Sequence, residues 1–198
     1  MKKYIAEFIG TAVLSLAVVG SIINGAGFVT LLTVGLTLGL LVATIGSISG
    51  AHVNPAVTLG LLSIKKINWK EALIYIVAQF AGAALALILV RLHGVPSLDI
   101  TFDFSWATII AEVIGALVFT FGIASIVLAT DSAKAESKAP FVIGGSLTLG
   151  ATIAAGLGSN AILNPAVAFA IGSFGLAYII GPLVGAVAGV WLFKALKV

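Results

Sequence analysis

Two short polar motifs interrupt an otherwise apolar chain. Residues 54–57 and 164–167 both read Asn-Pro-Ala-Val. Asparagine is a preferred residue for the N-cap of a helix, and proline suits the first helical turn because no backbone N–H is needed there. Each motif is therefore predicted to begin a helix, and each asparagine could donate hydrogen bonds to a passing oxygen atom. The predicted pore residues are Asn54, Pro55, Ala56, Asn164, Pro165 and Ala166.

Three ionisable residues lie in or beside apolar segments: Glu7, His52 and Glu112. A carboxylate at the centre of a membrane helix costs about 2.5 to 3.5 kcal/mol on insertion scales, so both glutamates need partners or a proton. They could accept hydrogen bonds from nearby loops, or they could form a proton relay in a coupled transporter. His52 could titrate near a pore mouth, but a histidine in a packed loop is more often simply hydrogen-bonded in place, and we favour that interpretation.

The composition identifies the elements that must position these residues. The 198 residues are 61% hydrophobic and only 9% charged, and the mean hydropathy of +1.24 is that of a membrane protein. The absence of cysteine excludes disulfides and thiolate chemistry, and no residue spacing indicates a metal or cofactor site. We predict an all-α membrane protein with six transmembrane helices, each near the ~20 residues that cross a bilayer. The apolar segments are 5–23, 28–48, 72–90, 106–129, 140–158 and 175–193.

The basic residues indicate the orientation of the chain in the lipid bilayer. Both chain ends and the connections after the second and fourth spans carry the lysines, at positions 2, 3, 65, 66, 70, 134, 138, 194 and 197. In a six-span chain these regions lie on one side, which the positive-inside rule makes the cytoplasm. The net charge of +3 therefore reports topology and does not indicate nucleic acid. We expect a plasma-membrane protein with both termini in the cytoplasm.

The two halves of the chain resemble each other. Residues 6–10 pair with 111–115, and 54–57 pair with 164–167. Each half holds three spans, an odd number, so the halves must have opposite orientations in the membrane. The prediction is a single domain, 1–198, built as a 3+3 inverted repeat with halves 1–98 and 99–198. The polar segment 131–138 is expected to be a loop that joins the halves.

Each half also contains a segment that is too short for another crossing, at 49–62 and 158–172. Non-helical backbone inside a membrane is tolerated only where it is buried in protein or lines a water-filled path. We therefore expect two re-entrant loops, each followed by a half-helix, that meet at the middle of the membrane. The residues before each asparagine, 50–53 and 159–163, are expected to expose carbonyl groups as hydrogen-bond acceptors.

The paired Asn-Pro-Ala motifs, the sequence of residues 49–58 and the glutamates of the first and fourth spans together resemble the aquaporin and glyceroporin channels of the major intrinsic protein family. The resemblance covers essentially the whole chain. It implies a homotetramer with a pore in each monomer, permeation by water and small neutral solutes, and no cofactor. It also favours a structural role for Glu7 and Glu112 as acceptors that support the re-entrant loops, and the positive ends of the half-helices would repel cations.

The chain departs from this family at the outer constriction. Most members have an arginine after the second Asn-Pro-Ala motif, where this chain has Val167. Alignment assigns the other constriction positions to Val34, Ala151 and Ala161, so all four are small or aliphatic. A narrow apolar ring would close by dewetting, but two alanines opposite two valines favour a wide one. We expect a passive channel for water and small uncharged solutes, such as glycerol, urea or gases, with weak discrimination.

Three alternatives remain open at this point. Inverted repeats and broken helices also build secondary transporters, which would need a charged or ion-coordinating site at mid-membrane. An aquaporin-like protein that does not conduct is a second alternative, since an apolar ring can block water. An enzyme is the weakest, because His52 has no serine or carboxylate at a spacing typical of a catalytic pair. We therefore expect the chain not to be an enzyme.

Overall fold

The computed structural model describes residues 1–25, 27–94 and 105–197, and all regular elements in this part of the chain are helices. Six of them are long and apolar enough to cross a membrane, whereas α3 and α7 are short. The predicted all-α membrane fold with six spans and two half-helices is confirmed. The helices are α1 Lys2–Ile23, α2 Phe28–Ser49, α3 Pro55–Ser63, α4 Trp69–Leu92, α5 Trp106–Val127, α6 Ser132–Gly156, α7 Pro165–Ala170 and α8 Leu176–Leu196.

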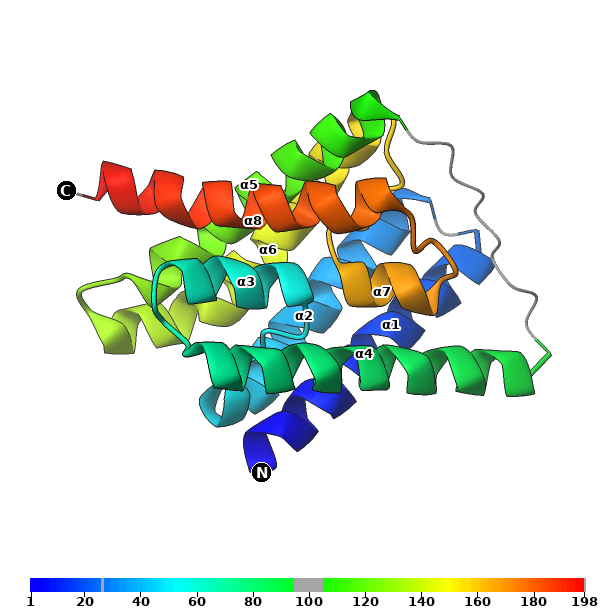
Figure 1. Ribbon diagram of the computed structural model, residues 1–198, viewed down its shortest axis with the longest axis horizontal. Helices are drawn as coiled ribbons and strands as arrows, with labels where there is room; N and C mark the ends of the chain where they lie inside the picture. Colours follow the sequence, from blue (N-terminus) through cyan, green and yellow to red (C-terminus); the bar gives the residue numbers. More distant parts are fainter. Residues whose placement is uncertain (26, 95–104, 198) are drawn as a thin grey trace.

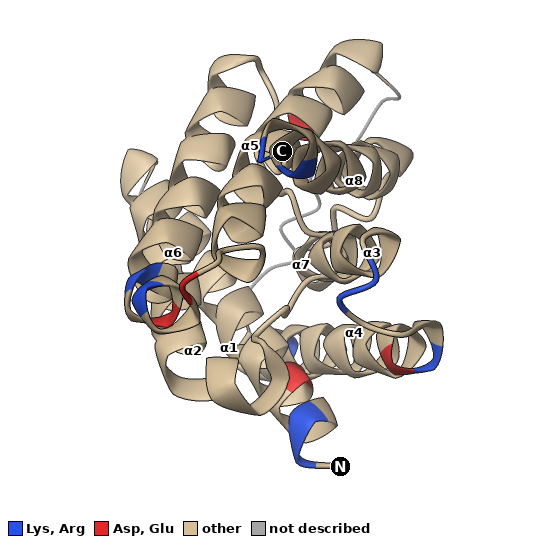
Figure 2. Ribbon diagram, turned by 90° about the vertical axis from the view of Figure 1, so that its left-hand side faces the viewer, with Lys and Arg blue, Asp and Glu red and all other residues tan. Residues whose placement is uncertain are grey.

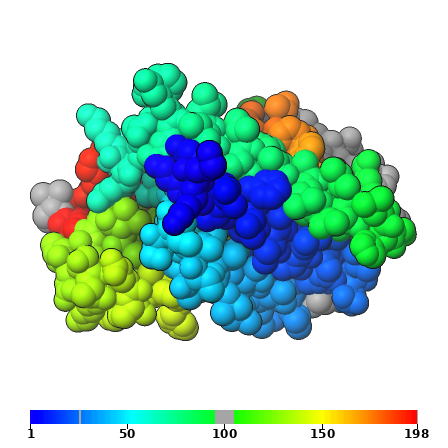
Figure 3. Space-filling view, turned by 90° about the horizontal axis from the view of Figure 1, so that it is seen from below, coloured from blue at the N-terminus to red at the C-terminus, as the bar shows by residue number. Residues whose placement is uncertain are grey.

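The long helices form two groups that meet through α2 and α6. In the first group α1 packs against α2 and α4, and in the second α5 packs against α6 and α8. The first group is seen from outside in Figure 3, where the dark blue α1 lies between α2 and α4. The half-helices α3 and α7 lie end to end between α4 and α8 (Figure 1). Because α3 packs on α8 and α7 packs on α4, each half-helix is held by the last span of the other repeat.

Glycine allows the closest helix contacts. A Cβ atom on Gly39 of α2 would lie 2.8 Å from the carbonyl oxygen of Pro140 in α6, too close for a real contact. A Cβ atom on Gly115 of α5 would lie 2.7 Å from the carbonyl oxygen of Gly150, also in α6. Small residues at such crossings let membrane helices pack backbone to backbone. Helix α6 therefore packs closely against both α2 and α5.

One predicted boundary was wrong. Residues 132–138 were expected to form a loop, but they are the first turns of α6, which begins at Ser132. The side chain of Asp131 caps this helix by accepting a hydrogen bond from the N–H of Lys134 at 3.0 Å. The segment is polar because it extends beyond the apolar region, and its alanine, lysine and glutamate residues favour a helix. The predicted boundary between the halves, at 98/99, lies outside the described residues.

Both ends of the chain and most of the lysines lie at one end of the bundle. Figure 2 looks onto this end and shows basic residues near the N-terminus, after α3, at the start of α4 and α6, and in the last turns of α8. The chain is thus a multi-pass membrane protein whose two termini are on the same side. The opposite end carries the connection between α1 and α2 and the loop that precedes α7.

Candidate permeation pathway

The two Asn-Pro-Ala motifs begin the two half-helices, as their residue types predict. Asn54 has extended backbone, and its Oδ1 accepts a hydrogen bond from the N–H of Ala56 at 2.8 Å. Asn164 repeats this arrangement, and its Oδ1 accepts from the N–H groups of Ala166 at 3.0 Å and Val167 at 3.4 Å. The proline that follows each asparagine occupies the first helical position, where its missing N–H leaves nothing unsatisfied. Each asparagine side chain is therefore fixed by its own helix.

The same two asparagines join the repeats to each other. Nδ2 of Asn54 donates to the carbonyl oxygen of Leu163 at 2.9 Å, and Nδ2 of Asn164 donates to the carbonyl oxygen of Val53 at 3.0 Å. These reciprocal bonds hold the tips of α3 and α7 together. An amide nitrogen carries two hydrogens, so each asparagine keeps a second N–H for another acceptor. Both side chains line the cavity described below, where such an acceptor could bind.

The loops before the half-helices have unusual backbone conformations. Ala51 and Val53 have φ values of 49° and 42°, and Ala161 and Leu163 have values of 55° and 52°. A left-handed conformation costs a residue other than glycine about 1 to 2 kcal/mol, and a β-branched valine is especially unsuited to it. The first pair and the second pair occupy equivalent positions of the two repeats. The same strain is thus built into both loops, and strain of this kind persists only where the surrounding structure enforces it.

Glu7 enforces the conformation of the first loop. Its Oε1 accepts hydrogen bonds from the N–H of His52 at 3.0 Å and from Oγ of Ser49 at 2.7 Å. Its Oε2 accepts from the N–H of Val53 at 2.7 Å and from Nε2 of Gln79 at 2.8 Å. The side chain is completely buried, and donors surround both oxygens. The carboxylate therefore satisfies backbone groups of a loop that cannot satisfy them itself.

Glu112 does the same for the second loop. It accepts hydrogen bonds from the N–H groups of Ile162 at 3.0 Å and Leu163 at 2.8 Å, and also from Oγ of Ser159. Like Glu7 it is fully buried, and neither glutamate lines the cavity. A proton relay or ion site on the pathway would need at least one of them to face it. The geometry therefore matches loop support and gives no support to a coupled transporter.

His52 is held in the first loop by its own contacts. Its Nδ1 lies 3.1 Å from Oγ1 of Thr58, and its ring packs edge-on against Tyr75 with centroids 5.1 Å apart. Sequence reasoning missed Gln79 and Thr58, which complete this network because Nε2 of Gln79 also donates to Oγ1 of Thr58 at 3.0 Å. The signal for Gln79 was available, since it is an amide in the middle of an apolar span. The histidine reaches the inner end of the cavity but is otherwise buried.

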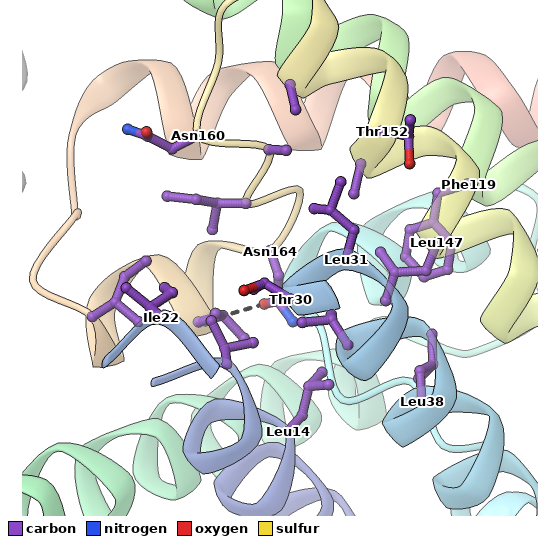
Figure 4. A pocket seen from close by; sticks show the side chains of 18 of the residues that line it. Leu14, Ile22, Thr30, Leu31, Leu38, Phe119, Leu147, Thr152, Asn160 and Asn164 are labelled. Carbon is purple, nitrogen blue, oxygen red and sulfur yellow. Dashed lines mark hydrogen bonds between the residues drawn. The ribbon is translucent and has the colours of Figure 1, made fainter. Parts of the chain in front are cut away.

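A cavity of about 630 Å³ leads from the end of the bundle opposite the termini to the two asparagines. Its mouth lies between the C-terminal end of α1, the start of α2 and the loop before α7. Figure 4 shows apolar side chains such as Leu31, Leu38 and Leu147 around Asn164. No described residue that lines the cavity is aspartate, glutamate, lysine or arginine. The nonpolar lining also includes Leu14, Val18 and Phe119.

All four positions assigned to the constriction line this cavity: Val34, Ala151, Ala161 and Val167. Thr152 lines it too, and sequence reasoning missed this residue. Its hydroxyl donates to the carbonyl oxygen of Thr148 at 2.7 Å, so its lone pairs stay available as acceptors. Neighbouring positions on a helix differ by about 100°, and the sequence did not reveal how α6 is rotated. The wall at this level is therefore aliphatic with one added hydroxyl.

The predicted ladder of carbonyl acceptors is partly occupied. The carbonyl oxygens of Val53 and Leu163, which end the two ladders, each already accept a hydrogen bond from the asparagine of the other repeat. These two carbonyl oxygens already bond across the junction between the half-helices, so each has only its remaining lone pair for a permeant. The remaining lining groups that can bond to a solute include the asparagine N–H groups and the hydroxyls of Thr30 and Thr152.

The half-helices of the inverted repeat meet beside a cavity with no aspartate, glutamate, lysine or arginine among its described lining residues, which favours the class of membrane channels over ion-coupled carriers. Comparison with known proteins identifies the family within this class. The sequence profile of the family described as "Major intrinsic protein" matches residues 1–193. The chain belongs to the major intrinsic protein family, the aquaporins. It is accordingly a passive channel for water or small solutes and is not an enzyme.

Several relatives match over nearly the whole chain. Aquaporin Z of Bradyrhizobium diazoefficiens is 32% identical, with 100% of this chain and 94% of the relative covered. Aquaporin AqpM of Methanothermobacter marburgensis is 33% identical, with 94% and 93% covered. Among solved structures, the aquaglyceroporin of Plasmodium falciparum matches with a TM-score of 0.67 and 25% identity, covering 99% of this chain and 94% of the other.

Proposed function

We propose that this channel conducts water and small uncharged solutes of the size of glycerol or urea, as well as dissolved gases, with weak discrimination among them. The observation that carries the proposal is the aliphatic wall at the positions where the family resemblance leads us to expect an arginine and its partners. Val167, Val34, Ala151 and Ala161 offer no charge to repel a cation and no donor to orient a solute. Selection at this level rests on width and on the cost of removing water from the solute.

The two asparagines are the principal polar groups on the proposed pathway. A solute oxygen that reaches the tips of α3 and α7 can accept the free N–H of Asn54 and of Asn164 in turn. The amino-terminal ends of the two half-helices also carry partial positive charge, which opposes hydronium and other cations. Proton exclusion is therefore expected to remain although the arginine is absent. A proton current comparable to the water flux in planar bilayers would contradict this part of the proposal.

We further propose a homotetramer in the plasma membrane with both termini in the cytoplasm. The orientation is supported by the lysines that gather at the end of the bundle that holds the termini. The tetramer is what the family resemblance implies, and large apolar side chains exposed on α1 and α2 are available for it, among them Ile5, Ile9, Leu36 and Leu40. In a bilayer these side chains face either lipid or another subunit, and cross-linking in native membranes distinguishes the two.

The test is stopped-flow light scattering of proteoliposomes, with empty liposomes alongside. A sucrose gradient should give fast shrinkage with a low activation energy, and a glycerol gradient should give shrinkage followed by rapid reswelling. Reswelling no faster than in empty liposomes would refute the wide, weakly selective filter. Absence of water flux would favour a protein that does not conduct, and saturable flux that depends on an ion gradient would favour a secondary transporter.

A further inference from the structure

Three lysines belong to two segments that meet, the residues just after α3 and the last turns of α8. The indole nitrogen of Trp191 donates to Oγ of Ser63 at 3.1 Å, which joins the two helices. The ammonium group of Lys194 lies 4.4 Å from the centroid of the Trp191 ring. Lys65 and Lys66 come soon after Ser63 in the chain, with only Ile64 between. We call Lys65, Lys66 and Lys194 the basic cluster, and Figure 2 shows its segments on the end of the bundle that holds the termini.

The basic cluster is held in place by its backbone and by the tryptophan. The N–H groups of Lys65 and Lys66 donate to the carbonyl oxygens of Leu62 and Leu61, each at 2.9 Å, so the chain after α3 is a closed turn. Lys65 occupies this turn in the left-handed region, with φ of 61°. All three lysine side chains are exposed. The backbone that carries Lys65 and Lys66 is thus held in a turn, and all three lysine side chains are accessible from outside the bundle.

No carboxylate neutralises these charges within the described residues. Segments 63–70 and 191–197 contain no aspartate or glutamate, and the nearest acidic residue in the chain, Glu71, is paired with Lys3. The lysines at the start of α6 differ, because Lys134 and Lys138 alternate with Asp131 and Glu136. Positive charge therefore accumulates at the junction of α3 and α8 but is balanced at the start of α6.

We propose that the basic cluster binds the phosphate of an anionic phospholipid in the leaflet that surrounds this end of the bundle. Exposed tryptophans mark the headgroup level in membrane proteins, and Trp191, which is 47% exposed, stands beside the cluster. Clustered lysines next to a membrane helix attract anionic headgroups. The indole of Trp191 would contact the glycerol region of the lipid while the lysines contact its phosphate. This proposed site lies on the exterior of the bundle, at the end that holds the termini, and none of its residues lines the solute cavity.

The reporter for this proposal is Trp191 itself. The substitutions Trp69→Phe and Trp106→Phe leave it as the single tryptophan of the chain. The protein is reconstituted in phosphatidylcholine vesicles with increasing fractions of brominated phosphatidylglycerol, whose bromines quench only a tryptophan that they contact. Brominated phosphatidylcholine in unbrominated phosphatidylglycerol gives the reverse titration. Together they yield the affinity of the site for phosphatidylglycerol relative to phosphatidylcholine.

We expect a clear preference for phosphatidylglycerol, reduced in the triple variant Lys65→Gln, Lys66→Gln, Lys194→Gln. Each lysine near an anionic surface is worth about fivefold in affinity, so the reduction should reach at least fivefold. The matched control, Lys2→Gln, Lys134→Gln, Lys138→Gln, removes the same charge from the same end and should keep the preference. An equal loss of the preference for phosphatidylglycerol in both variants would mean that diffuse surface charge causes it, and would refute a specific site.

Two further outcomes would also overturn the proposal. Equal quenching by the two lipids in the parent protein would mean that no preference exists. Displacement of the lipid by inorganic phosphate at millimolar concentration would mean that the lysines bind free phosphate and do not recognise a lipid. Both triple variants should have the same water permeability as the parent protein. This result would show that the variants are folded. A failure of lipid binding would leave the channel function untouched.

Discussion

Replacement of Glu112 by glutamine tests whether a carboxylate is what holds the second re-entrant loop. The carboxylate accepts from the N–H groups of Ile162 and Leu163 and from the hydroxyl of Ser159, so donors approach both of its oxygens. Glutamine keeps one oxygen and exchanges the other for an NH₂ group. The oxygen can still serve Ser159 and Ile162, but the new NH₂ faces the N–H of Leu163, and two donors cannot bond to each other.

The size of the effect follows from this geometry. A hydrogen bond to a charged group is worth about 1.5 to 3 kcal/mol, and a buried N–H left without a partner costs about 1 to 3 kcal/mol. Both energies refer to the same lost contact, so they are not added. We expect Glu112→Gln to lower the free energy of unfolding by about 2 to 3 kcal/mol. Leu163, whose left-handed backbone at φ of 52° depends on this contact, would be released. Water permeability should fall with it, because Leu163 also accepts from Asn54.

The assay is unfolding of the detergent-solubilised protein in a titration with sodium dodecyl sulfate, followed by tryptophan fluorescence. Glu136→Gln is the control, because it makes the same chemical change at an exposed position of α6. It should leave the free energy of unfolding within about 0.5 kcal/mol of the parent value. A change in Glu112→Gln as small as in this control, with unchanged water permeability, would refute the idea that the carboxylate enforces the loop.

Three further predictions concern the filter and the frame. Val167→Arg should lower glycerol permeability relative to water, because it adds bulk and charge to the wall, whereas Val167→Ala should not; an unchanged glycerol-to-water ratio in the arginine variant would refute the assigned role. Thr152→Val removes the hydroxyl at the constriction and should slow glycerol more than water in the same stopped-flow assay, while Thr44→Val, at an exposed position of α2, should slow neither. Gly39→Val forces a contact at 2.8 Å and should lower the free energy of unfolding by about 1 to 3 kcal/mol. Gly46→Val, whose Cβ atom would meet its nearest neighbour at 3.7 Å, is the matched control, and equal loss in both would contradict the packing argument.

The two repeats are equivalent in backbone but not in side chains. Both loops are supported by a buried glutamate and a serine, and both carry left-handed residues at equivalent positions. The first loop has the additional network of His52, Thr58 and Gln79, whereas in the second loop Nδ2 of Asn160 donates to the hydroxyl of Tyr178 at 3.0 Å. Oε1 of Gln79 is buried and has no partner among the described residues. The two loops are therefore supported by the same glutamate and serine arrangement but by different additional side chains.

The sequence by itself determined the membrane fold, the inverted repeat and the start of both half-helices. These features are local or periodic: apolar length fixes the spans, an odd number of spans fixes the inversion, and Asn-Pro fixes a helix start. It also located Glu7 and Glu112 as residues that require partners. It failed at Ser132–Lys138, where polarity was interpreted as a loop although Asp131 caps a helix there.

Only the tertiary structure decided which side chains face the pathway and which groups remain free to bond. The reciprocal bonds of Asn54 and Asn164 join residues more than a hundred positions apart, and no local pattern specifies them. The presence of Thr152 in the wall beside Ala151 depends on the rotation of α6, which is set by close contacts such as that of Gly115 with Gly150. Composition and motif spacing determine which helices form. The packing of one helix against another determines which side chains point into the cavity, and those side chains make up the wall of the filter.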